Sequence, residues 1–396
     1  MKILQVNNVY AEKSTGKLTM QLHEGLLKQG VEAVAVYGRG RTIRGEGVIR
    51  LCPDWYGKFH SFLSRMTGLP YGGCLLSTWR LMRIIRREKP DVVHLQCING
   101  HFVNIYRLIR WLKKNRIKTV VSLHAEFMYT ANCGHAYECM QWQSGCKHCP
   151  DGKKANKSWL LNRTRHSFRM MRKAFTGFEE DCVIAPVSPW TQQRGQQSLI
   201  LGKFPFETVL NGVDTAVFYR EPHHEAEPAT ALSVTAHFTP DPNHHKGGWY
   251  LIQLAKRMPD VQFLVAGRAE AAEDLPENLH LLGEIRDQKA LAELYRRAAV
   301  SLLVGKRETF SMPCAESLCC GTPVVGFRAG APEQIALEEY SDFADHGDLD
   351  TMETLVRRWL NRQPDRCALA QTAGAAYSTN TMVKHFMELY RRLLWN

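Results

Sequence analysis

The sequence has no apolar run of 18 residues or more. A membrane-spanning helix needs about 20 apolar residues, so none is predicted. A secretory signal peptide is not indicated either, because the first ten residues carry one lysine and a short apolar stretch that continues into a globular pattern, MKILQVNNVY. We therefore expect the chain to work in the cytoplasm.

Acidic residues are scarce in the first half of the chain. Residues 1–205 hold 32 Lys and Arg against 13 Asp and Glu, whereas the remainder holds 19 against 26. Such an asymmetry indicates that the first half faces a polyanion. An anionic membrane, to which each basic residue adds about 1 kcal/mol of attraction, and a nucleic acid both fit. The basic helical segments of this half are equally typical of solvated helices that cover a sheet.

Length and patterning predict two α/β domains. A chain of 396 residues, 44% of them hydrophobic, exceeds what one core usually supports. Short apolar strands alternate with helical patterns in both halves, which is typical of doubly wound, Rossmann-like sheets. We place the N-terminal domain at 1–205 and the second domain at 206–375, and expect an amphipathic terminal helix in 376–396.

Within residues 308–333, the two acids Glu308 and Glu316 lie eight positions apart after a buried strand. A strand, a turn and a helix with free N–H groups form a site suited to a phosphorylated ligand. Carboxylates accept hydrogen bonds from sugar hydroxyls, so the pair also suits a sugar. A surface helix with ordinary acids explains the local pattern equally well.

Four cysteines fall within 17 residues, in the order Cys133, Cys139, Cys146 and Cys149. The C-x2-C spacing at the end of this insertion (133–150) is the usual half of a structural zinc site. Disulfides and simply reduced thiols are the alternatives, and the absence of an export signal favours reduced thiols over disulfides. A zinc ion with four protein ligands would be structural, because no position remains for chemistry.

The whole chain resembles the retaining glycosyltransferases of the GT-B fold, family 4. The resemblance is carried by Asn-Gly-Val-Asp at 211–214, Lys-Gly-Gly at 246–248, the two acids of 308–316 and Gly-x-x-Glu at 330–333. The cysteine segment is similar to that of colanic-acid and exopolysaccharide enzymes of this family. The resemblance implies two domains facing across a cleft, with the terminal helix packed back on the first.

The implied activity is transfer of a sugar from a nucleotide-diphosphate donor to a lipid-linked or polysaccharide acceptor in cell-surface glycan assembly. No cofactor is needed for catalysis. The implied location is the cytoplasm, with peripheral contact to the inner face of the membrane through the basic domain and no nucleic acid partner.

The resemblance also implies roles in donor binding. Glu308 contacts the donor sugar, Glu316 holds the ribose hydroxyls, and Lys246 neutralises the departing diphosphate, a step to which electrostatic stabilisation usually contributes most. The backbone N–H groups at the sugar and diphosphate are those of Phe310, Ser311 and Met312.

In the first domain, the resemblance implies that Gly16 lets a loop approach the phosphate and that His124 lies near the reacting sugar. Residues 14–17 look like the end of a Walker A loop, but its upstream glycine is missing, so a P-loop is rejected. Two positions depart from the family. An Arg usually precedes the Lys, and Arg268 is the proposed substitute. An acid usually follows the histidine, where this chain has Ala125 and then Glu126.

Two other functions remain to be tested. A zinc-containing nucleic-acid-binding protein explains the charge and the cysteines, but leaves Glu308, Glu316 and the second domain without a role. A GT-B-like nucleotide-sugar epimerase or phosphorylase keeps the fold, although we see no lysine placed as a phosphorylase-type cofactor anchor.

Overall fold

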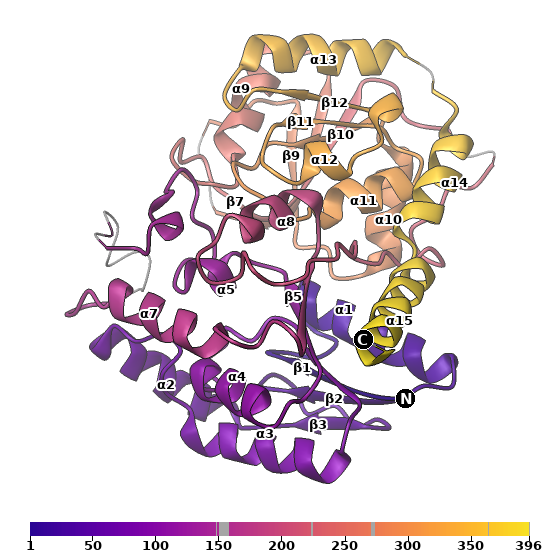
Figure 1. Ribbon diagram of the computed structural model, residues 1–396. Coiled ribbons are helices and arrows are strands. Elements are labelled where there is room, and N and C mark those ends of the chain that lie inside the picture. Colours follow the sequence, from indigo (N-terminus) through magenta and orange to yellow (C-terminus); the bar gives the residue numbers. More distant parts are fainter. Residues whose placement is uncertain (148, 150–157, 223–224, 271–273, 363, 396) are drawn as a thin grey trace. The chain divides into compact units, whose positions relative to one another are not determined.

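The computed structural model describes the chain except residues 148, 150–157, 223–224, 271–273, 363 and 396. It divides into two compact units, one formed by Met1–Leu210 with the chain from Met382 onwards, the other by Asn211–Thr381. Each unit contains one six-stranded parallel sheet with helices on both faces (Figure 1). The predicted class, two doubly wound Rossmann-like domains, is confirmed.

The sheet of the first unit has the order β3-β2-β1-β4-β5-β6. Its strands are nearly continuous apolar runs because both faces are covered. They are β1 (Lys2–Asn7), β2 (Glu32–Tyr37), β3 (Val48–Arg50), β4 (Val92–Leu95), β5 (Thr119–Leu123) and β6 (Cys182–Pro186).

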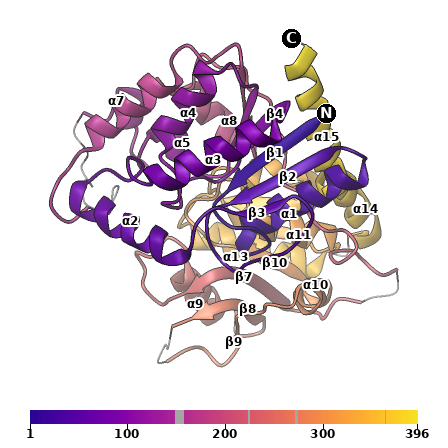
Figure 2. The same ribbon diagram turned by 90° about the horizontal axis from the view of Figure 1, so that it is seen from below.

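Helices α3, α4 and α7 cover one face of this sheet, and α1 and α15 cover the other (Figures 1 and 2). The main core of the unit lies under α3, α4 and α7. Its helices are α1 (Lys13–Lys28), α2 (Asp54–Thr67), α3 (Leu75–Glu88), α4 (Ile105–Lys114), α5 (Phe127–Thr130), α7 (Thr164–Phe175), α8 (Pro189–Gln196) and α15 (Thr379–Trp395), with a 3-10 turn η1 (Gln141–Gln143).

The sheet of the second unit has the order β12-β11-β10-β7-β8-β9. Its strands are β7 (Thr230–Phe238), β8 (Gln262–Ala269), β9 (Leu279–Gly283), β10 (Val300–Leu303), β11 (Val324–Phe327) and β12 (Ser341–Ala344). Its helices are α9 (Gly248–Arg257), α10 (Gln288–Arg297), α11 (Met312–Cys319), α12 (Pro332–Ile335), α13 (Leu349–Asn361) and α14 (Arg366–Tyr377), with a 3-10 turn η2 (Glu338–Tyr340).

Helix α15 returns to the first unit. From Met382 onwards it belongs to that unit, where the methyl groups of Val383 fill the space beside Gly25 of α1. The Tyr390 hydroxyl lies 2.6 Å from Nδ1 of His94 on β4. Among the residues that the structure describes, no helix is long and apolar enough to cross a membrane.

Candidate active site

The candidate donor site lies where the strand order of the second sheet reverses, between β7 and β10. In open parallel sheets, ligands bind at such a switch point, outside the carboxyl ends of the strands. Lys246 follows β7 and Glu308 follows β10, and Nζ of Lys246 lies 2.7 Å from Oε1 of Glu308. The two side chains are 25% and 31% exposed, so both atoms remain reachable by a ligand.

The loop that carries Lys246 is held tightly against the end of β10. Gly247 has φ +74°, and a Cβ there would lie 2.1 Å from the carbonyl oxygen of Val304. The backbone N–H of Lys306 donates to the carbonyl of His245 at 2.8 Å. A glycine is therefore required at 247, and the contact fixes the lysine beside the acid.

The loop before α12 pins the backbone of Glu308. The N–H of Glu308 donates to the carbonyl of Ala329 at 3.0 Å, and the Glu308 carbonyl accepts from Ala331 at 3.2 Å. The carboxylate of Glu333 in turn accepts from the N–H groups of Ala329 at 3.0 Å and Gly330 at 2.9 Å. Glu333 thus acts on the site through the backbone beside Glu308.

Helix α11 begins next to this pair. Its N-cap, Ser311, is buried and has φ +79°, a strained conformation for a residue with a side chain. The ring of Phe310 is buried in the core, so this residue presents its backbone to the site. The first N–H groups of a helix have no partner within it, which suits the role expected of Phe310, Ser311 and Met312.

Glu316 lies on α11, and its carboxylate accepts a hydrogen bond from the buried hydroxyl of Tyr295 on α10 at 3.4 Å. Burial, together with the charge of Glu316, raises the pKa of Tyr295 well above its ordinary value. The hydroxyl therefore stays protonated and donates to Glu316. The sequence pattern carries no signal for Tyr295.

The expected second cation, Arg268, lies exposed near the end of β8, where it pairs in register with His237 of β7. Nε2 of His237 lies 2.9 Å from Oε1 of Glu270. The rings of His237, His244 and His245 follow one another at centroid distances of 5.4 Å and 4.5 Å, leading to Lys246. The role of Arg268 in phosphate binding stays a prediction.

His124 directly follows β5, in the first unit, and its ring is partly exposed. Its Nε2 lies 2.7 Å from Oε1 of Gln96. The Gln96 amide nitrogen is 3.2 Å from Oε1 of Gln5 and 3.4 Å from Nδ1 of His94. Because the amide oxygen of Gln96 only accepts, Nε2 of His124 carries the proton in this arrangement.

Burial lowers the pKa of His124 to about 4 and that of His94 to about 3. Both rings are therefore neutral at pH 7. Because unfolding lets these rings bind protons below their ordinary pKa of about 6.5, this part of the stability is present above pH 6.5 and is lost as pH falls towards the folded values.

Gln96→Glu should raise the pH at which activity falls on the acid side, because a carboxylate beside His124 favours the imidazolium. The pH profile of kcat/KM measures this shift. Gln192→Glu is the matched control, since Gln192 accepts a hydrogen bond from Thr208 in the same unit and should leave the profile in place. If the acid limb of the pH profile is the same in Gln96→Glu as in the wild type, His124 takes no part in the reaction.

Gly16 lies in the first turn of α1, and a Cβ there would be 3.0 Å from Cγ2 and 3.2 Å from the carbonyl oxygen of Val9. The loop after β1 also holds Ala11 and Lys13 at φ +58° and +57°. The close approach of this loop explains the glycine within the protein itself. Phosphate contact by Gly16 stays a prediction.

The four clustered cysteines lie close enough to influence one another's ionisation. Burial, followed by the charges of Cys149, Cys146 and Cys139, raises the pKa of Cys133 to about 12. All twelve cysteines are free thiols. Among the described residues, no three His, Cys, Asp or Glu side chains are arranged to hold a metal ion. The zinc ligands therefore stay a prediction.

Glu126 anchors the cysteine segment. It is fully buried, and Oε1 of its carboxylate accepts from Nε of Arg194 and from the Tyr129 hydroxyl, both at 2.6 Å. The Arg194 guanidinium lies 4.9 Å from the rings of Trp142 and Trp190. The Glu126 carboxylate is buried and bound by Arg194 and Tyr129. Glu126 therefore does not replace the acid that the family usually has directly after the histidine.

If the cluster binds zinc, purified protein should hold about one zinc per chain by elemental analysis, and Cys133→Ser or Cys146→Ser should remove the metal and lower Tm. Cys367→Ser is the control, because Cys367 lies exposed on α14. Metal-free protein with an unchanged Tm in Cys133→Ser would identify the cluster as reduced thiols.

Comparisons with known proteins agree with this fold. The model of "Glycosyltransferase Family 4" matches residues 15–217 and that of "Glycosyl transferases group 1" matches residues 236–375. Two Rossmann-like units and these two family models identify a glycosyltransferase enzyme of the GT-B type. The chain belongs to glycosyltransferase family 4.

Several known proteins are similar to this chain at low sequence identity or over part of its length. The chain is 21% identical to the putative colanic acid biosynthesis glycosyl transferase WcaC of Escherichia coli K12, over 99% of this chain and all of that protein. It is 30% identical to a mycobacterial GDP-mannose-dependent alpha-(1-6)-phosphatidylinositol dimannoside mannosyltransferase, from Mycobacterium tuberculosis, over 41% of this chain and 46% of that protein. Sucrose-phosphate synthase from Thermosynechococcus elongatus has a TM-score of 0.67 at 15% identity, covering 100% of this chain and 99% of the other. Anabaena HepE, solved with UDP, has a TM-score of 0.62 at 14% identity, covering 99% and 100%.

Proposed function

We propose that the protein is a retaining glycosyltransferase that moves a sugar from a nucleoside-diphosphate donor, bound by the second unit, to a lipid-linked or polysaccharide acceptor in cell-surface glycan assembly. The observation that carries the proposal is the Lys246–Glu308 pair at the switch point of the second sheet, beside the start of α11. An ammonium, a carboxylate and the N–H groups at the start of α11, which have no partner within the helix, meet there, and they match a diphosphate joined to a sugar.

The ion pair explains how the site exchanges partners when the donor binds. In the protein without ligand, Lys246 and Glu308 neutralise each other at 2.7 Å. A diphosphate offers the ammonium more negative charge than one carboxylate does, so Lys246 turns to the phosphates. Glu308 is then released to the sugar hydroxyls, where its charge stabilises the positive charge that develops on the ring.

The chemical step is a front-face displacement. The acceptor oxygen forms a bond to the anomeric carbon on the side from which the diphosphate leaves, and the bond between that carbon and the phosphate oxygen breaks. The leaving phosphate takes the proton of the acceptor hydroxyl. Neutral His124 donates its Nε2 proton to Gln96, so near the sugar its Nδ1 serves as a hydrogen-bond acceptor for a hydroxyl group.

The relatives support the donor and acceptor classes. Anabaena HepE has been solved with UDP and with UDP-glucose, the Escherichia coli relative is named for colanic acid biosynthesis, and the mycobacterial one for a phosphatidylinositol dimannoside. A polysaccharide or glycolipid acceptor fits a basic first domain that contacts the inner face of the membrane.

A thermal-shift screen of UDP, GDP, ADP and their sugars tests donor binding. One nucleotide should raise Tm, since a ligand at 100 times its Kd adds about 2.7 kcal/mol. Glu316→Ala should reduce the Tm shift caused by the nucleotide, because Glu316 is assigned to the ribose. The Tm shift caused by pyrophosphate, which has no ribose and is expected to be smaller, should stay unchanged in this variant. A screen in which no nucleotide shifts Tm would contradict the proposal.

A further inference from the structure

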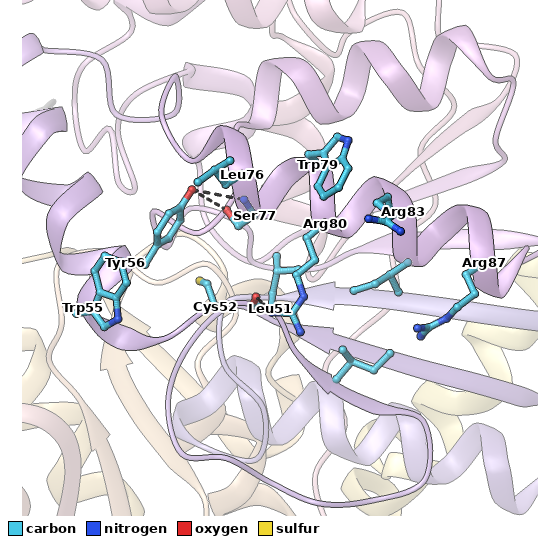
Figure 3. Close-up of a pocket in the computed structure, with 12 residues that line it drawn as sticks. Leu51, Cys52, Trp55, Tyr56, Leu76, Ser77, Trp79, Arg80, Arg83 and Arg87 are labelled. Atoms are coloured by element: carbon cyan, nitrogen blue, oxygen red, sulfur yellow. Dashed lines mark hydrogen bonds between the residues drawn. The ribbon is translucent and has the colours of Figure 1, made fainter.

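The first unit contains a cavity of about 840 Å3 beside its edge strand β3 and the helices α2 and α3 (Figure 3). This volume lies within the range of about 300–1,000 Å3 that small-molecule sites occupy. None of its twelve lining residues belongs to the candidate active site. We therefore consider the cavity as a ligand site separate from the candidate active site.

The walls of the cavity are mainly apolar. They are formed by six large side chains, Ile49, Leu51, Trp55, Leu76, Trp79 and Ile84. The Tyr56 hydroxyl in the same wall accepts hydrogen bonds from the hydroxyl of Ser77 at 3.3 Å and from its N–H at 3.4 Å. Because these polar groups are partnered within the protein, the wall offers a ligand a predominantly hydrocarbon surface.

Three arginines of α3 border this apolar space, at positions 80, 83 and 87, and no lining residue is acidic. Arg80 reaches the carbonyl of Leu51 at 2.6 Å, while Arg83 extends along the helix with its guanidinium 4.7 Å from the Trp79 ring (Figure 3). Apolar walls with a cationic border match a ligand that has a hydrocarbon tail and an anionic head.

Helix α2 extends the apolar surface outside the cavity. Trp55, Phe59, Phe62 and Met66 follow one another at helical spacing and are 66%, 52%, 50% and 36% exposed. The ring of Trp159, itself exposed, lies 5.7 Å from that of Phe62 and widens the patch. An amphipathic helix normally buries such a face, so a face turned outward marks an interaction surface.

We propose that the cavity and the outward face of α2 form a docking surface for an anionic phospholipid bilayer. An acyl chain enters the cavity, and the lipid phosphate is held by Arg83 and Arg87. Tryptophan and phenylalanine beside arginine are the residues that settle at a membrane interface. The proposal deepens the membrane contact of the proposed function and rests on it.

The charge of this surface favours an anionic bilayer over an uncharged one. Residues 54–88 hold six Lys and Arg against two acids. Both acids are already paired, Asp54 with Arg50 at 3.1 Å, and Glu88 with Lys2 at 2.9 Å and with Arg87 at 2.7 Å. Arg87 therefore shares its charge between Glu88 and a bound phosphate, whereas Arg83 has its guanidinium over the Trp79 ring. The segment therefore presents net positive charge around an apolar centre, which complements anionic headgroups above acyl chains.

Co-sedimentation with phosphatidylglycerol–phosphatidylcholine vesicles tests the proposal. Wild-type protein should bind these vesicles and bind pure phosphatidylcholine far more weakly. Arg83→Gln with Arg87→Gln should weaken binding about 25-fold, at about fivefold per arginine. The control pair, Arg86→Gln with Arg107→Gln, removes the same charge from exposed positions outside the cavity and should lose less. Equal losses of vesicle affinity in the two double variants would show that binding depends on net charge alone. That result would contradict a specific phosphate site at Arg83 and Arg87.

The apolar part is tested by Trp55→Ser with Phe59→Ser, which should abolish vesicle binding without lowering Tm, because both side chains are exposed. Unchanged binding by this variant contradicts the proposal. Polyglutamate and glycerol 3-phosphate are the competing probes. Tight binding to polyglutamate without binding to vesicles would show that the surface binds an acidic protein. Tight binding to glycerol 3-phosphate without binding to vesicles would show that it binds a free phosphate compound.

Donor turnover on an acceptor without a lipid, measured with no vesicles present, separates this proposal from the proposed function. The docking variants should turn over donor at the wild-type rate while failing to bind vesicles. Wild-type protein that binds vesicles but turns over no donor would refute the proposed function and leave the docking surface standing.

Discussion

Glu308→Gln should keep the affinity for the donor nucleotide and lower kcat by about 10²–10³, the loss typical of one group that stabilises transition-state charge. The amide keeps the size and one hydrogen-bond acceptor of the carboxylate but loses the charge opposite the developing positive ring. Lys246 loses its partner in the free protein, so nucleotide binding stays equal or becomes slightly tighter.

Steady-state kinetics with the best donor, together with the nucleotide Kd by calorimetry, measures this separation. Glu339→Gln is the matched control, because Glu339 is exposed on the 3-10 turn of the same unit. If Glu308→Gln loses affinity for the nucleotide and keeps its kcat, Glu308 contacts the nucleotide and not the sugar.

Lys246→Met should lower kcat/KM by about 10³, because the methionine keeps the length of the side chain and removes the cation that receives the leaving diphosphate. The affinity difference between the nucleoside diphosphate and its nucleoside should shrink in this variant. Affinity for the nucleoside itself should stay unchanged, since Lys246 is assigned to the phosphates.

Calorimetry with both ligands checks this result. Lys256→Met, on α9 of the same unit, supplies the control. Lys246→Arg should retain part of the activity, because the charge remains while its geometry changes. Equal losses of nucleoside and nucleotide affinity in Lys246→Met would indicate a collapsed site and contradict the assignment.

The sheets and the donor segment were predictable because they follow from local pattern. Buried parallel strands are short apolar runs, and the alternation of such runs with helical patterns that is predicted for both halves is found in both units. Lys246 and Glu308 came from a family resemblance, and their contact followed from the sheet order, which brings the ends of β7 and β10 together.

Helix α2 is not among the elements that the sequence analysis predicts, yet Asp54–Thr67 is helical. Its stripe of Trp55, Phe59, Phe62 and Met66 faces outward, whereas only Gly57 and Ser64 of the helix are buried. The helical spacing of this stripe is visible in the sequence, whereas the direction in which the apolar face points is not.

Two supporting residues of the site could not be predicted from the sequence. Tyr295 and Gln96 act through single hydrogen bonds to Glu316 and His124. These contacts join segments with no periodic signal between them. Glu333 belongs to the Gly-x-x-Glu motif, and the structure adds its hydrogen bonds to the backbone of Ala329 and Gly330. Glu126 was noted in the sequence as a displaced acid, and only its burial against Arg194 shows that it anchors the cysteine segment.

The anomeric configuration of the product tests the central claim most directly. Donor of known anomeric configuration, identified by the nucleotide screen, is incubated with acceptor, and proton NMR of the new glycosidic linkage is recorded before any further reaction. The Lys246–Glu308 site with front-face displacement predicts that the donor's configuration is retained. An inverted linkage would contradict the account.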